Sequence, residues 1–284
     1  MTARALLRAR PSRVRASRLR PGLWSAMAFL ALVALAAAAP GLLADGSPTA
    51  SDITESLLPP GTDHLLGTDA NGRDIYTRIV HGARPSLLTG IGATALAVVC
   101  GTLLGLLAAL GGRVADEVVM RLADTVLSLP SLLLALLILS VTGPGTVGTL
   151  YAIAVYSIPV YARLVRVQTM VIRRSGYVEA ARSLGLREPR IVLRHIVPNA
   201  FGPLLVLATI EVGTAIVAAS SLSYLGFGPQ PPAPEWGAML GGGRDYFGIA
   251  WWVAVFPGLA ITATVLSIVV TGRWLQRRLE GRPT

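Results

Sequence analysis

The stretch from Thr125 to Ala162 reads TVLSLPSLLLALLILSVTGPGTVGTLYAIAVYSIPVYA and carries no charged residue over its 38 positions. A helix needs about 20 apolar residues to cross the hydrocarbon core of a bilayer, and a single helix of this stretch would be roughly 57 Å long. That is too long for one crossing. Gly143-Pro144-Gly145 lies near the middle and favours a tight turn. The stretch therefore predicts two membrane-spanning helices joined as a hairpin.

Four more apolar segments flank this hairpin. Residues 21–44, 85–112 and 246–272 are free of charge, and residues 200–225 are interrupted only by Glu211. The whole chain is 53% apolar and 14% charged, with a mean hydropathy of +0.61, as expected for a protein that uses lipid as its solvent. We predict an all-α integral membrane protein with six transmembrane helices, at about 23–43, 87–110, 122–141, 147–166, 200–222 and 250–272.

The arginines indicate the orientation. An even number of spans places both termini on one side, and basic flanks stay in the cytoplasm. The chain has no lysine, and with cytoplasmic termini 21 of its 25 arginines lie on the cytoplasmic side. The net charge of +10 is then explained by orientation and by anionic lipid headgroups, so nucleic-acid binding is not needed to explain it. We predict a multi-pass protein of the cell membrane.

The N-terminal region allows a second interpretation. Leu23 to Ala39 behind a basic arm also resembles a secretory signal, with Ala37-Ala38-Ala39 as the cleavage site. Its apolar run exceeds the usual signal core of about 7–15 residues, and its removal would leave an odd number of spans, so a retained first helix fits better. The single cysteine, Cys100, and three scattered histidines predict neither a disulfide framework nor a metal site.

The organisation along the chain follows from these spans. We expect a basic cytoplasmic arm (1–22), a first transmembrane helix (23–43), an external segment (44–85), a transmembrane domain of five helices (86–275) and a cytoplasmic tail (276–284). Within the external segment, Asp74 to Arg84 has the spacing of a helix lying at the interface, although an ordinary loop helix is equally compatible.

The long loop 168–199 inside the transmembrane domain predicts two short helices joined by a turn. Val178, Ala181 and Leu184 recur at helical spacing, and Gly185 can adopt the left-handed conformation that ends a helix. Pro189 suits the first position of the second helix, and Pro198 is expected to end it.

Three motifs resemble a known family. Glu179-Ala180-Ala181, followed by Gly185 and by Pro198-Asn199, resembles the EAA loop of binding-protein-dependent ABC importer permeases. The segments His64 to Asp74 and Leu222 to Leu240 resemble the dipeptide, oligopeptide and nickel branch. The resemblance extends over nearly the whole chain and is closest to the second permease subunit, of the dipeptide permease C type. His195 departs from the general family pattern, which prefers an aliphatic residue there. Thr77 and Pro85 depart from the branch, which more often has serine and an aliphatic residue at these places. These departures weaken the match little.

This resemblance implies a type I ABC importer permease fold and a set of partners. These are a homologous permease, two ATP-binding subunits or domains that hold ATP and magnesium, an external solute-binding protein, and a peptide as cargo. The EAA loop would couple the chain to the ATPase through Glu179, Ala180, Ala181, Gly185, His195, Pro198 and Asn199. Candidate contacts for the external binding protein are Asp69, Arg73, Asp74 and Trp236.

The sequence excludes the chemistry of several enzyme classes. A P-loop ATPase needs a lysine on the phosphates, and this chain has none. Gly241-Gly242-Gly243-Arg244 lacks the residues that complete such a loop, so we expect a flexible segment there. Intramembrane peptidases need paired aspartates, a zinc motif or a Ser-His pair within their spans, and these are missing too. We predict a transport subunit with no catalytic residue, metal site or cofactor of its own.

Glu211 is the one acidic residue at mid-depth of a predicted span, where a carboxylate is costly unless it is paired or faces water. It either lines the translocation path or anchors the partner permease. A single such acid does not favour a self-sufficient secondary transporter, which remains the alternative from a different class. The cargo stays open between peptides, nickel and haem.

Overall fold

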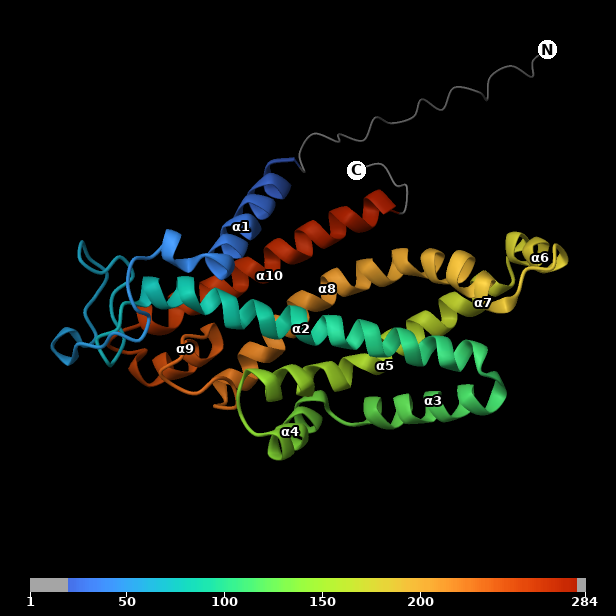
Figure 1. Cartoon of the computed structure of the whole chain (residues 1–284). Helices are drawn as coiled ribbons and strands as arrows, with labels where there is room; N and C mark the ends of the chain where they lie inside the picture. The colour runs from blue at the N-terminus through green and yellow to red at the C-terminus, as the bar shows by residue number, and fades with distance from the viewer. Residues whose placement is uncertain (1–19, 280–284) are drawn as a thin grey trace, which may run out of the picture.

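The computed structural model describes residues 20–279, and in this range α2, α5, α8 and α10 run side by side along the long axis of the molecule (Figure 1). An isolated bridge between Thr68 and Asp74 is the only β contact among these residues, which confirms the predicted all-α class. Most of the predicted basic arm (1–22), and the end of the predicted tail (276–284), lie outside the described residues. The elements are α1 (Arg20–Ala38), η1 (Pro40–Leu42), η2 (Ile53–Glu55), α2 (Ile75–Leu110), α3 (Gly112–Ser128), α4 (Ser131–Thr142), α5 (Thr146–Arg173), α6 (Gly176–Ser183), α7 (Glu188–Ile191), η3 (Val192–Ile196), α8 (Val197–Tyr224), α9 (Trp236–Gly243), η4 (Arg244–Tyr246) and α10 (Trp252–Leu279).

Five segments within the described residues are long and apolar enough to cross a membrane, and a sixth span arises if α3 and α4 are counted together. The turn predicted at Gly143-Pro144-Gly145 is present, because α4 ends at Thr142 and α5 begins at Thr146. The helix before the turn, α4, has only 12 residues, so it is not a spanning helix by itself as the predicted hairpin requires. Gly143 and Gly145 both have positive φ, of 80° and 130°. The five are Pro21–Ala38, Ile75–Leu110, Thr146–Arg173, Glu188–Tyr224 and Trp252–Arg278.

The third predicted span, 122–141, is wrong as a single straight helix. α3 and α4 meet at an angle of 98°. Pro130 has no N–H for the helix ladder and forces the preceding Leu129 into an extended conformation, with φ −87° and ψ 138°. Figure 1 shows α4 lying across the bundle beneath α5, instead of continuing along α3.

Two predicted boundaries in the N-terminal half of the chain also need correction. The first transmembrane helix, predicted at 23–43, ends at Ala38 because Pro40 holds Ala39 outside the helical region. α2 begins at Ile75, so the last residues of the segment predicted as external, 44–85, are helical. The interface helix expected over Asp74 to Arg84 is instead the first three turns of α2, which runs on through Pro85. Packing on Trp236 explains this, because its indole N–H donates to Ile79 O at 2.9 Å.

The prediction that Pro198 ends a helix is wrong as well. Residues 188–224 form one continuous helical rod in which η3 is a π-helical turn. Proline is tolerated in the first turn of α8, where an N–H is not essential. The side-chain amide of Asn199 also donates to His195 O at 2.6 Å, which satisfies a carbonyl of the irregular turn.

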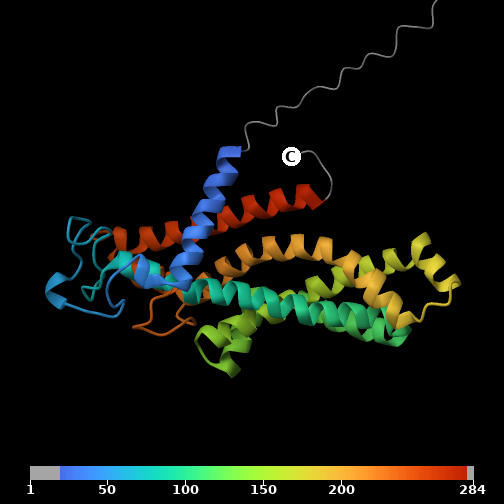
Figure 2. The same ribbon diagram turned by 45° about the horizontal axis from the view of Figure 1, so that its top comes forward.

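The core of the bundle is built on small residues. Ala93, Ala97, Gly101, Gly105 and Ala109 recur every fourth position along α2, and all five are buried. A stripe of this kind allows two helix backbones to approach closely inside a membrane. α1 joins the same body, because Val33 and Ala36 lie in a buried cluster with Trp236. The second view shows α1 crossing α10 (Figure 2).

Two ion pairs fasten α3 to α5 at the end of the molecule where α6 lies. Asp116 forms a bidentate pair with Arg166, in which Nη2 and Oδ2 are 2.6 Å apart, and Asp124 pairs with Arg163. Arg121 pairs with Glu117 at 2.6 Å on the surface of α3.

Arg166→Gln is expected to destabilise the protein because it leaves a partly buried carboxylate without its bidentate partner. The Asp116 and Arg166 side chains are 25% and 27% exposed, and removing one partner of such a pair costs about 1–3 kcal/mol. Arg121→Gln is the matched control, since exposed pairs contribute about 0–1 kcal/mol. Thermal stability of the detergent-solubilised protein, followed by size-exclusion chromatography, measures both. Equal shifts for the two variants would show that the α3–α5 pair is dispensable.

Candidate functional site

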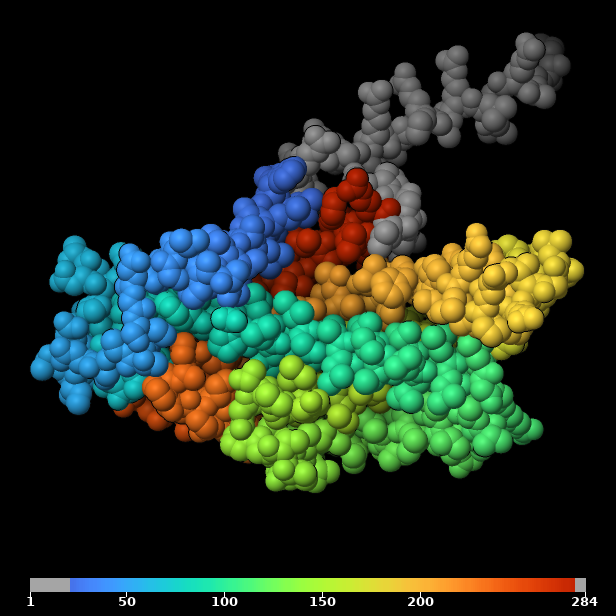
Figure 3. All heavy atoms as spheres, viewed as in Figure 1, coloured from blue at the N-terminus to red at the C-terminus, as the bar shows by residue number. Residues whose placement is uncertain are grey.

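The loop between α5 and α8 forms a compact unit at one end of the molecule. α6 and α7 pack on the neighbouring helices through a buried apolar cluster contributed by Ile172, Val178, Ala181, Ile191, Ile196 and Ala200. Figure 3 shows the segment around α6 projecting beyond the body of the molecule. The unit of α6 and α7 is therefore held to the rest of the protein by its buried side, and its other side is exposed.

Gly185 makes the turn between α6 and α7. Its φ is +79°, the left-handed conformation that the sequence predicts there. Gly185 N–H donates to Arg182 O at 2.9 Å and Leu186 N–H donates to Ala181 O at 3.1 Å, which together form a Schellman motif. A side chain added at Gly185 would meet no atom within 4 Å, so only backbone conformation demands glycine here.

The predicted coupling residues separate into two groups. Glu179, Ala180, Gly185, Pro198 and Asn199 are exposed. Ala181 is buried in the cluster beneath them, and His195 is half-buried, with its ring centroid 6.2 Å from that of Tyr177.

Leu184 is not on the face that its spacing predicted. It lies one residue beyond α6, at the turn, and the residue is 81% exposed. Leu193 is 72% exposed on the following rod. Arg182 and Glu188 join α6 to α7 at 2.8 Å, and next to them residues 184–187, 189 and 190 line a hollow of about 590 Å³. The exposed Leu184 lines this hollow, and an exposed apolar side chain beside a hollow is compatible with a surface that another protein covers.

The opposite end of the molecule holds three of the predicted external contacts. The Asp69 carboxylate accepts the backbone N–H of Asn71 at 2.8 Å and of Arg73 at 3.0 Å, closing a tight loop. Asp74 caps α2 by accepting Thr77 N–H at 2.9 Å, and its other oxygen lies 3.3 Å from His64. Figure 1 places this loop region far from α6.

Trp236 is placed differently from the prediction. It is 1% exposed and lies between α2 and α9, where no docking protein can reach it. Sequence reasoning missed its neighbour Glu235, a buried carboxylate that accepts Gly237 N–H at 3.0 Å and Ala238 N–H at 2.8 Å. Ser86 donates to the same carboxylate at 3.1 Å. Gly241 to Gly243, expected in a flexible segment, are the last turn of α9. The sequence signal that could have revealed Glu235 is its place directly before a helix, because an acidic residue there favours the N-cap role.

Glu211 lies near the middle of α8 and is half-exposed in the single chain. No group in the described part of the chain forms a hydrogen bond with it. On α5, which packs against α8, the hydroxyl of Tyr161 is buried without a hydrogen-bond partner. Among residues 20–279, no group of three or more His, Cys, Asp or Glu side chains is arranged to hold a metal ion.

The comparisons with known proteins agree with this architecture. Residues 101–284 match the family described as "binding-protein-dependent transport system inner membrane component". The di/tripeptide transport system permease protein DppC of Pseudomonas aeruginosa is 45% identical over 218 residues, which cover 77% of this chain and 72% of the relative. A putative peptide transport system permease protein of Brucella suis is 38% identical over 99% of this chain and 91% of its own length.

Solved structures share the fold. An inward-facing structure of the MetNI methionine ABC transporter superposes with a TM-score of 0.58 at 20% sequence identity, covering 71% of this chain and 96% of the other. A crystal structure of an amino acid ABC transporter superposes equally well, with 19% identity. The predicted ABC importer permease fold is confirmed. From the match of residues 101–284 and from these relatives, we conclude that the chain belongs to the family of binding-protein-dependent transport system inner membrane components.

Proposed function

We propose that this chain is one of two homologous permease subunits in an ATP-binding cassette importer of dipeptides or oligopeptides. The observation that supports it is the unit formed by α6 and α7, which is exposed outward and fixed inward to α5 and α8 by a buried cluster. The relatives named above support a peptide cargo, and the same architecture carrying nickel or haem is the alternative.

The coupling mechanism follows from the rod of residues 188–224. An ATPase docked on Glu179, Ala180 and the adjoining hollow pushes on α6 and α7. Because α7, η3 and α8 are continuous, the displacement reaches Ala215, Ala219 and Leu222, which pack against α2 and α5. The spans then rock between inward and outward access. Gly185, His195, Pro198 and Asn199 hold the shape of this lever.

The chemistry of ATP hydrolysis belongs to the partner subunits in this proposal. The chain has no lysine for a P-loop, so ATP and magnesium bind to the two ATPase subunits. The remaining partners are an external solute-binding protein and the second permease. Both termini face the cytoplasm of the cell, the loop unit of α6 and α7 lies on that side, and residues 44–74 lie outside.

The function is tested by reconstituting the purified complex in liposomes. With the solute-binding protein outside and ATP inside, radiolabelled dipeptide should accumulate, and it should not accumulate when ATP is replaced by a non-hydrolysable analogue. Accumulation driven by an ion gradient without ATP would support a secondary transporter.

In intact cells, Glu179→Cys should react only with membrane-permeant thiol reagents. Labelling by an impermeant reagent would place residue 179 outside the cell and contradict the proposed topology.

Glu211 is proposed to line the translocation path, where its carboxylate attracts the amino group of a peptide. Glu211→Gln is expected to lower uptake of a free-amino dipeptide by about tenfold, equivalent to ~1.4 kcal/mol, and uptake of its N-acetylated form by less. Glu211→Asp keeps the charge and is the matched control. If Glu211 instead anchors the partner permease, less complex will assemble, and uptake of both peptides will fall in the same proportion.

A further inference from the structure

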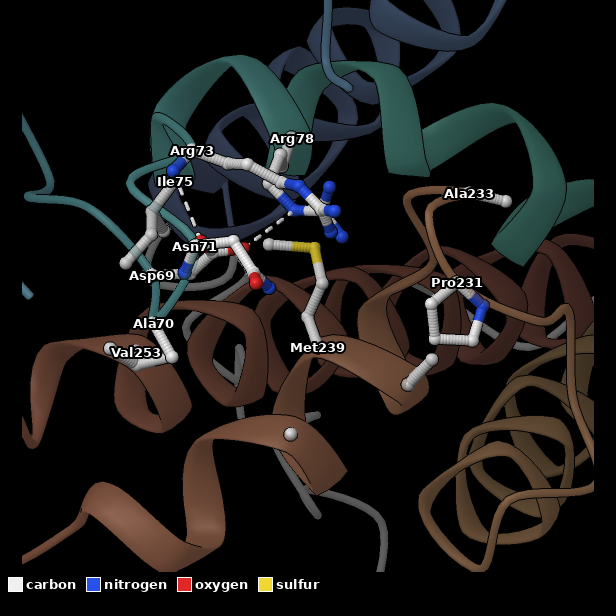
Figure 4. Close-up of a pocket in the computed structure, with 12 residues that line it drawn as sticks. Asp69, Ala70, Asn71, Arg73, Ile75, Arg78, Pro231, Ala233, Met239 and Val253 are labelled. Atoms are coloured by element: carbon white, nitrogen blue, oxygen red, sulfur yellow. Dashed lines mark hydrogen bonds and ion pairs between the residues drawn. The ribbon is translucent and has the colours of Figure 1, made fainter. Parts of the chain in front are cut away.

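A small cavity opens beside the start of α2, at the end of the molecule opposite α6. It has a volume of about 140 Å³ and lies between the loop before α2, the first turn of α2, and α9. Ile75, Met239 and Val253 form apolar walls, and Asp69, Arg73 and Arg78 supply the charge. Figure 4 shows both arginine side chains extending into this opening, with Met239 facing them.

Arg78 is a fixed cation in the wall of the cavity. Its side chain is 8% exposed and donates from Nη1 to Pro48 O at 2.8 Å and to Pro232 O at 3.2 Å. Its Nε lies 3.6 Å from Oδ2 of Asp69. Three chain segments therefore hold the guanidinium in one position.

Arg73 adds a second cation that lacks any such partner. Its Nε is buried without a hydrogen bond, and no group among residues 20–279 pairs with its side chain. The only carboxylate lining the cavity, Asp69, already accepts two backbone N–H groups and faces Arg78. The cavity thus has one negative and two positive groups.

A sheltered pair of like charges with a free donor is costly unless an anion completes it. We infer that the cavity formed by Asp69, Arg73 and Arg78 receives a carboxylate from an aspartate or glutamate side chain of the solute-binding protein. This inference rests on the proposed function, and it names the chemistry of that partner's contact.

Size favours a side chain over the cargo. A volume of 140 Å³ corresponds to about five waters at ~30 Å³ each, whereas pockets for small molecules usually measure about 300–1,000 Å³. A carboxylate on a short apolar stem fits both the volume and the walls of Ile75, Met239 and Val253. Guanidinium groups also bind carboxylates in a planar, directional way that fixes the orientation of a docked protein.

The test uses the complete importer in lipid nanodiscs and titrates the solute-binding protein while ATP hydrolysis is measured. Arg73→Gln is expected to raise the concentration for half-maximal stimulation about tenfold, and Arg73→Glu to raise it further. The matched control is Arg84→Gln, which removes the same charge from an exposed position of α2 outside the cavity. It should leave the concentration of binding protein for half-maximal stimulation unchanged.

Charge reversal then identifies the partner group. Among binding-protein variants that each replace one exposed acid by arginine, one should restore stimulation of the Arg73→Glu complex. The inference is overturned if Arg73→Gln and Arg84→Gln behave alike, or if no reversed variant restores stimulation. It is also overturned if Arg73→Gln changes only the half-saturating peptide concentration at saturating binding protein, since the cargo then fills the cavity. A wild-type complex that the binding protein does not stimulate would instead contradict the proposed function itself.

Discussion

Gly185→Val is expected to reduce ATP-dependent uptake by tenfold or more while the complex still assembles in the membrane. The residue has φ +79°, and a β-branched side chain in the left-handed region costs about 1–3 kcal/mol. The turn can release this strain only by abandoning the Schellman hydrogen bonds to Ala181 and Arg182. α6 then loses its fixed angle to α7, and a push from the ATPase is absorbed in the loop. Uptake and ATP hydrolysis measured on the same preparation show the loss of coupling.

A graded series separates backbone strain from side-chain bulk at this turn. Gly185→Asn should retain most of the uptake, because asparagine tolerates the left-handed conformation, and Gly185→Ala should lie between asparagine and valine. Gly176→Val introduces the same side chain into the same loop at a glycine that has open space and no positive φ. Equal losses at Gly176 and Gly185 would assign the effect to bulk at the docking surface and contradict the role of the turn.

The elements that the sequence predicts well are those set by local chemistry. The turn between α4 and α5 follows from three residues, Gly143 to Gly145, inside an apolar run. The conformation of Gly185 follows from a helical pattern that stops at a glycine. In both cases the preference resides in a few neighbouring residues, so distant contacts do not overrule it.

Prolines account for most of the errors in the predicted helices, because their effect depends on surroundings that the sequence does not display. Pro130 breaks a span, whereas Pro85 and Pro198 lie within continuous helices. Around Pro85 the helix is held on both sides, by Trp236 donating to Ile79 and by Ser86 bonded to Glu235. Such support comes from residues about 150 positions away, which no local pattern reveals.

For the candidate site too, features set by local sequence could be predicted, whereas features set by packing between distant segments could not. Exposure of Glu179 and Ala180 agrees with a docking surface that was predicted from a motif. The burial of Trp236 and the cavity between Arg73 and Arg78 could not be predicted, since they depend on how α9 packs against α2. The pairing of Asp116 with Arg166 joins residues from separate helices and was likewise beyond reach.

The interface between α2 and α5 could have been located from a signal that the sequence contains. Gly101 and Gly105 stand four residues apart in an apolar helix, the spacing at which membrane helices pack closely. A β-carbon added at Gly105 would lie 2.6 Å from Ala162 O and 2.8 Å from Val165 Cβ. Both obstacles are rigid, because one is backbone and the other is the branch point of a buried side chain.

Gly105→Val is therefore expected to prevent stable folding of the subunit, and Gly105→Ala to destabilise it by about 1–3 kcal/mol, as overpacking does in other cores. Gly92→Ala makes the same change on the same helix, but there the added carbon meets Leu150 Cδ1 at 2.7 Å, the end of a flexible side chain that can rotate away. Thermal unfolding of the purified complexes should show a clear loss for Gly105→Ala and almost none for Gly92→Ala. If both variants melt like the wild type, α2 and α5 do not pack closely at Gly105, and the rod of α8 has no rigid wall to act on.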